Sequence, residues 1–160
     1  MKHKVTYFLT LLIAVLWISS CGTRRNNVVS RSFHNTTTFF NYEYNATRKL
    51  KEGQLAINAA YRVPPEGYIP VWFAGTEEDS KSNSNTFDQT IEICEIALQK
   101  HNQKDNKHFD DLRFIIGRSW FYKRNYILAI SNFEHILKKY PDSDLIPVSY
   151  THLTLPTICS

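Results

Sequence analysis

The most informative segment of the chain runs from Asp110 to Asp144 and reads DDLRFIIGRSWFYKRNYILAISNFEHILKKYPDSD. Apolar residues recur at helical spacing in each of its halves. They are Leu112, Ile115, Ile116 and Trp120 in the first half, and Ile127, Ile130, Phe133, Leu137 and Tyr140 in the second. The short segment Lys-Arg-Asn, at 123–125, separates the two sets. This pattern predicts two amphipathic helices joined by a tight turn.

Four residues of this stretch stand at the mutual spacings of the tetratricopeptide repeat, a helical hairpin with a period of about 34 residues. They are Gly117, Ala129, Phe133 and Pro141. The stretch therefore resembles such a repeat, although Arg113 replaces the usual aromatic residue and Trp120 stands where tyrosine is common. The resemblance implies an all-α fold of tetratricopeptide-type hairpins, part of an α-solenoid. It also implies that Gly117 and Ala129 let the two helices approach, that Phe133 fills the gap and that Pro141 ends the second helix.

A further helix is predicted to begin at Thr86, because Phe87, Ile91, Cys94 and Leu98 fall at i, i+4, i+7 and i+11. Thr86 and Gln89 match a capping box. Cys94 is expected to be a small buried apolar residue. Residues 86–146 are thus predicted to be tetratricopeptide-like helices. Since a single repeat cannot bury both of its faces, neighbouring helices are required.

Residues 36–85 are predicted to form a helical hairpin followed by a proline-containing connector. Gly53 is expected to end the first helix, and residues 54–61 to form a short second helix before Pro64. The apolar segment YIPVWF, at 68–73, is predicted to pack across helices, with a partner-binding strip as the alternative. The polar residues 75–85 are predicted to form a loop.

The N-terminus has the pattern of a signal peptide. Lys2 and Lys4 precede the uncharged segment Val5–Ile18, which is too short to span a membrane well. Ile18-Ser19-Ser20-Cys21 then resembles the lipobox of bacterial lipoproteins. The resemblance implies that residues 1–20 are a lipoprotein signal peptide, that Cys21 is acylated and that residues 21–35 form a lipidated tether. The Gly22 that follows favours sorting to the outer membrane.

The other end of the chain is expected to be non-native. Val148 to Thr157 reads VSYTHLTLPT, which resembles the translation of a transposase adaptor used in sequencing libraries. Residues 147–160 are therefore left out of the fold prediction, and the natural chain is expected to be truncated near Ile146. On this interpretation Tyr150, His152 and Cys159 carry no functional weight.

Several segments together narrow the resemblance. The order CGTRRNN, SRSFHNTTTFFNYEYNATRKLKEG, GYIPVWF and then tetratricopeptide helices is similar to the N-terminal part of a tetratricopeptide lipoprotein of the Bacteroidetes type IX secretion and gliding-motility machinery. This family implies a scaffold that is anchored in the outer membrane, faces the periplasm and binds other secretion-machinery proteins. Tetratricopeptide lipoproteins that assist outer-membrane β-barrel assembly are the alternative. Nutrient-binding lipoproteins fit less well.

The sequence does not favour an enzyme, because it holds no GxSxG, HExxH, phosphate-loop or CxxC motif. No cofactor, metal or small-molecule substrate is predicted, and His101 and His108 are expected to be solvated. The formal net charge of +4 comes without a clustered basic face, so no nucleic-acid partner is expected. Binding to partner proteins would rest on a few aromatic or arginine side chains. The candidates are Trp120, Tyr122, Arg124 and Tyr126.

Overall fold

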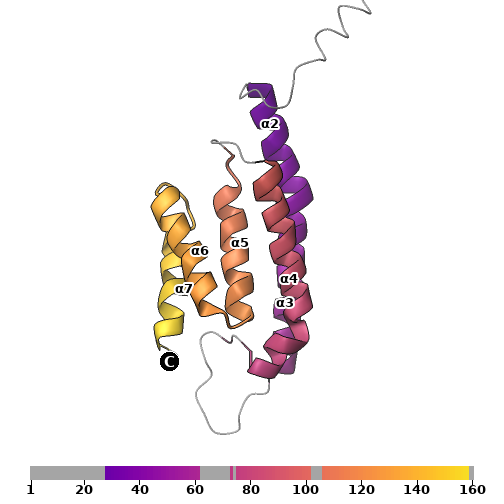
Figure 1. The fold of residues 1–160 in the computed structure, drawn as a ribbon, viewed down its shortest axis with the longest axis vertical. Coiled ribbons are helices and arrows are strands. Elements are labelled where there is room, and N and C mark those ends of the chain that lie inside the picture. Colours follow the sequence, from indigo (N-terminus) through magenta and orange to yellow (C-terminus); the bar gives the residue numbers. More distant parts are fainter. Residues whose placement is uncertain (1–27, 62–72, 74, 102–105, 159–160) are drawn as a thin grey trace, which may run out of the picture.

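The computed structural model describes residues 28–61, 73, 75–101 and 106–158. Their elements are α2 (Val28–Thr37), the π-helix η1 (Thr38–Glu43), α3 (Tyr44–Ala60), α4 (Glu77–Lys100), α5 (Phe109–Tyr122), α6 (Tyr126–Lys139) and α7 (Ile146–Ile158). All elements in this described part are helices, which confirms the all-α class. From α3 onward each helix packs against the next one in the chain (Figure 1).

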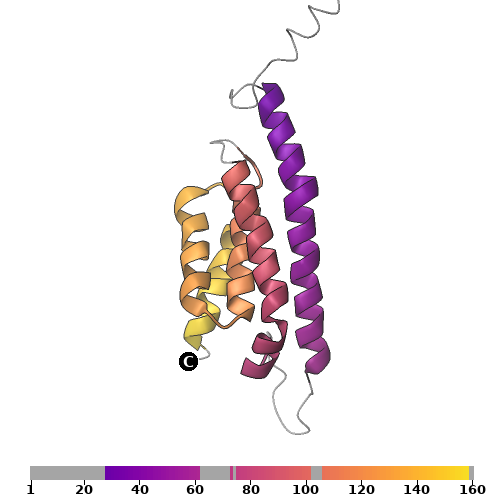
Figure 2. The ribbon, with the colours of Figure 1, turned by 45° about the vertical axis from the view of Figure 1, so that its right-hand side comes forward.

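The first three elements form one long helix rather than a hairpin. Figure 2 shows α2, η1 and α3 as a continuous rod along one side of the molecule, with α2 extending beyond the other helices. Within η1 the ladder widens, since the N–H of Tyr44 donates to the carbonyl oxygen of Phe39. The predicted break at Gly53 is wrong, because α3 continues through this residue to Ala60.

The contact between α3 and α4 explains why a glycine occupies position 53. A Cβ added to Gly53 would lie 2.7 Å from both Cε1 and Cζ of Phe87. Phe87 is fully buried, so its ring occupies the space that a larger residue at 53 would need. The glycine therefore permits a close approach of two helices and does not end one.

The start of α4 also differs from the prediction, which placed a loop at 75–85 and a cap at Thr86. Thr76 is the N-cap of α4: its side chain accepts from the N–H of Asp79, whose carboxylate accepts from the N–H of Thr76 in return. Glu77 and Glu78 add negative charge to the first turn, which favours a helix N-terminus. The segment is a helix because of these end effects, although it lacks an apolar stripe.

The apolar face predicted for the second half of α4 is confirmed for three of its four residues. Phe87, Ile91 and Cys94 belong to the core, while Leu98 is only partly buried against it. Cys94 is fully buried, and burial raises the pKa of its thiol. The residue therefore acts as a small apolar side chain, as expected.

The pair α5 and α6 has the contact that the tetratricopeptide resemblance implied. A Cβ on Gly117 would lie 2.7 Å from Cε1 and 2.9 Å from Cζ of Phe133. Ala129 and Phe133 are fully buried, and α6 ends at Lys139, just before Pro141. The prediction of a buried apolar face is wrong at Ile127, which is 82% exposed. The buried face of α6 carries Ala129, Phe133 and Ile136 instead.

Residues 146–158 form α7, which packs on α6. Ser149 and His152 are buried, and the His152 ring stacks on Phe133 with ring centroids 5.2 Å apart. The prediction that residues 147–160 are non-native concerns their origin, and the helical conformation of residues 147–158 does not bear on it.

Candidate interaction surface

Tyr122, one of the four predicted partner contacts, belongs to the core. The residue is 5% exposed, and its ring stacks on Phe87 with the ring centroids 5.5 Å apart and the planes 8° apart. Burial raises the pKa of its hydroxyl. The prediction of a partner contact is wrong at Tyr122, because the side chain fills the space between α4 and α5.

The other three predicted contacts surround the turn between α5 and α6. Arg124 is exposed and has a φ of 59°, and its guanidinium donates to the carbonyl oxygen of Gly75 at 3.0 Å. Trp120 is partly buried, with Nζ of Lys123 4.8 Å from the centroid of its ring. Tyr126 is partly buried and meets Phe121 edge to face. The turn is thus engaged with its own chain and does not present four free side chains.

A more exposed set of aromatic residues lies on the long helix. Phe33, Phe40 and Tyr44 are 55%, 64% and 61% exposed. Steps of seven and four residues separate them, and such steps keep side chains on one side of a helix. We call these three residues the aromatic stripe. Exposed apolar groups that cluster in this way mark interaction surfaces, and the aromatic content of 33–44 is the sequence signal that could have indicated this one.

The two histidines that were expected to be solvated are not. His101 is 6% exposed, and its Nδ1 lies 2.7 Å from Nδ1 of His34. Burial, and then the neighbouring His34, lower the pKa of His101. His108 is partly buried, with its Nδ1 2.7 Å from Oε2 of Glu43. The expectation failed because α2 and η1 cover the turn before α5.

Polar bonds fix this contact between the long helix and the turn. The Asn106 side chain donates to Oγ1 of Thr38 at 2.9 Å, and both residues are buried. The N–H of Lys107 donates to Oδ1 of Asn35 at 3.3 Å. The position of the aromatic stripe relative to the helical hairpins is therefore set by specific hydrogen bonds as well as by apolar packing.

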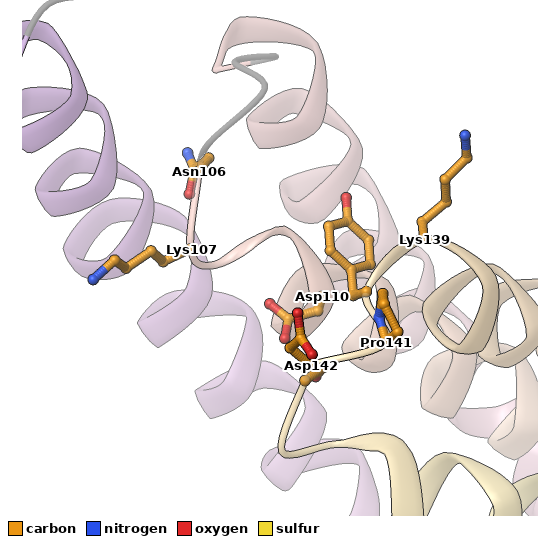
Figure 3. A pocket seen from close by; sticks show the side chains of 8 residues that line it. Asn106, Lys107, Asp110, Lys139, Pro141 and Asp142 are labelled. Carbon is orange, nitrogen blue, oxygen red and sulfur yellow. The ribbon is translucent and has the colours of Figure 1, made fainter.

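A shallow hollow of about 300 Å³ lies where the α6–α7 connection meets the start of α5, and Pro141 lines it. Figure 3 shows the carboxylates of Asp110 and Asp142 close to each other, while Lys107 and Lys139 point away from them. Oγ of Ser143 donates to Oδ2 of Asp110 at 2.5 Å. Charges of both signs at its rim do not select a ligand of one charge.

No protein-family model matches the chain, and no curated protein matches it. Within the described ranges, no helix combines the length and the apolar character needed to cross a bilayer. Cys21, the signal-peptide segment and the apolar segment 68–72 lie outside those ranges.

Proposed function

We propose that the chain is a lipid-anchored tetratricopeptide scaffold that binds other proteins of a secretion and gliding-motility machinery at the outer membrane. The observation that carries the repeat assignment is a contact that occurs twice. Gly53 meets Phe87 between α3 and α4, and Gly117 meets Phe133 between α5 and α6. Two successive hairpins that each hold a glycine against a buried phenylalanine support a stack of helical hairpins.

The scaffold role is supported by what the long helix leaves exposed. The aromatic stripe lies on a rod that continues beyond the rest of the bundle (Figure 2). Large aromatic side chains supply much of the binding energy of protein interfaces. In this proposal the hairpins hold the rod in place, and the stripe binds the partner.

The membrane anchor rests on the sequence alone. Ile18-Ser19-Ser20-Cys21 resembles a lipobox, and several acyl chains on one cysteine hold a protein on a membrane durably. Cys21→Ala should abolish lipid labelling and leave an unprocessed precursor. Normal labelling of this variant would remove the lipoprotein part of the proposal.

The partner-binding part is tested by photo-crosslinking in the native host. A photoreactive amino acid at Phe40 should give discrete adducts with secretion-machinery proteins. Ala56 is the matched control, since it is exposed on the same long helix but, twelve residues after Tyr44, lies about a third of a turn away from the stripe. Equal adduct patterns at both positions, or none at Phe40, would count against the stripe as the binding surface.

A further inference from the structure

Three potential metal ligands converge where η1 ends and α5 begins. They are Nδ1 of His108 and one carboxylate oxygen each from Glu43 and Asp111, and these atoms all lie within 4.8 Å of one another. Nδ1 of His108 is 2.7 Å from Oε2 of Glu43 and 3.6 Å from Oδ2 of Asp111. Glu43 is the last residue of η1, His108 immediately precedes α5, and Asp111 lies in the first turn of α5. The site therefore depends on the packing of the long helix against α5.

We propose that His108, Glu43 and Asp111 bind a divalent transition-metal ion of the Zn²⁺ type. One imidazole nitrogen and two carboxylate oxygens form a donor set that Zn²⁺ accepts. Two ligand atoms about 2.1 Å from a tetrahedral zinc ion are about 3.4 Å apart. The distance from His108 to Asp111 already suits this geometry, and Glu43 has to withdraw by less than about 1 Å. The fourth position would be open to water or to a partner's side chain.

A second observation concerns the Oε2 atom of Glu43. This atom is buried, and no N–H or O–H group of the described residues donates to it in hydrogen-bond geometry, although Nδ1 of His108 is close. A donor that is close but poorly aligned leaves part of the cost of burying this carboxylate oxygen uncompensated. A metal ion would accept its lone pair and remove this cost.

The charged groups around the three ligands also favour a bound cation. Asp110 lies beside the three ligands, so three carboxylates share one histidine. A divalent cation would balance this excess negative charge. The competing explanation is a plain His108–Glu43 ion pair that fastens η1 to α5, and this explanation predicts no metal binding.

The test is a calorimetric titration of the chelator-treated full-length chain with ZnCl₂, in a Cys21→Ser, Cys159→Ser background that removes two unrelated thiols. We expect one ion per chain. Asp111→Asn should weaken binding by at least about tenfold, and so should Glu43→Gln. Asp111→Asn leaves the His108–Glu43 pair in place, so this variant tests the metal site without removing the ion pair. The matched control is Asp142→Asn, at an exposed carboxylate on the nearby α6–α7 connection, and it should bind as the parent does.

Thermal unfolding supplies an independent readout. Zn²⁺ should raise the midpoint of the parent chain and of Asp142→Asn, because a ligand that binds only the folded state stabilises it. The midpoints of Glu43→Gln and Asp111→Asn should rise less than that of the parent at the same Zn²⁺ concentration. The proposal is overturned if the parent shows no saturable binding, or if binding survives in both variants. Loss of binding in His34→Gln with full binding in Asp111→Asn would overturn it too, since the ion would then occupy the His34–His101 pair.

Discussion

Phe133 lies so close to Gly117 that a Cβ at position 117 would be 2.7 Å from its Cε1 atom, and Phe87 stands in the same relation to Gly53. In both hairpins the glycine is on the first helix and the phenylalanine on the second. Because both rings are fully buried, they cannot move aside without disturbing the core. The two contacts set how closely each pair of helices can pack.

This contact makes a prediction about Gly117→Val. The added side chain should overpack the interface with Phe133 and lower the free energy of unfolding by about 1–3 kcal/mol. Valine is only a slightly better helix former than glycine, so the gain in helix propensity offsets little of this loss. Urea unfolding checks the prediction. Ser131→Ala, at an exposed position of α6, is the control and should change the value by less than about 0.5 kcal/mol. Unchanged stability of Gly117→Val would mean that the helices do not meet at this residue.

The start of α4 can be tested by two threonine substitutions. Thr76→Ala removes the acceptor for the N–H of Asp79 and should cost about 0.5–2 kcal/mol of unfolding free energy. Thr86→Ala lies inside the helix, where no cap is lost, and should cost less than about 0.5 kcal/mol. Chemical denaturation of the two variants decides between the structure and the sequence prediction. The reverse order of costs would place the N-cap at Thr86.

The buried His101 predicts a dependence of stability on pH. Its pKa in the folded chain lies below the ordinary histidine value of about 6.5, so the unfolded chain binds more protons as the pH falls through this value. The free energy of unfolding should therefore decrease between about pH 7.5 and about pH 5.5. His152, whose pKa burial lowers to about 4, acts in the same direction. Over this range His101→Gln should show a weaker dependence than the parent chain, as measured by urea unfolding at each pH. If the free energy of unfolding changed equally with pH in both chains, His101 would not be the source of the dependence.

The pair α5 and α6 could be predicted from the sequence because two signals agreed there. Apolar periodicity located the helices, and the spacing of Gly117, Ala129, Phe133 and Pro141 indicated how they meet. The prediction is wrong at Ile127 because this residue fits the helical spacing but lies in the first turn of α6, on a side that stays exposed. Which side of that turn is covered depends on tertiary packing.

The long helix and the start of α4 could not be predicted in the same way. Glycine is common just after the end of a helix, so the sequence predicts a terminus at Gly53, whereas this glycine makes room for the ring of Phe87 from α4. The segment 77–85 is polar on all sides, so its helicity rests on the cap at Thr76, on the acidic first turn and on the ion pair of Glu77 with Lys81 at 2.7 Å. Periodicity does not detect such a helix.

The cluster around His108 was missed because its members are distant in sequence. Asp111 is near His108 in the chain, but Glu43 reaches it only through the packing of η1 against the start of α5. Nothing in the sequence indicates that contact. The aromatic stripe was closer to prediction, since Phe33, Phe40 and Tyr44 lie in a segment rich in aromatic residues, yet only the structure shows which rings stay exposed.

The proposed role of this chain as an anchored scaffold of protein secretion is tested by comparing secreted cargo and outer-membrane β-barrels in a deletion strain of the native host. The deletion should abolish cargo secretion while barrel levels stay normal. The wild-type gene should restore secretion, whereas a gene carrying Phe33→Ala, Phe40→Ala and Tyr44→Ala should not. Normal secretion in the deletion strain, or depleted barrels as its main defect, would overturn the proposed role.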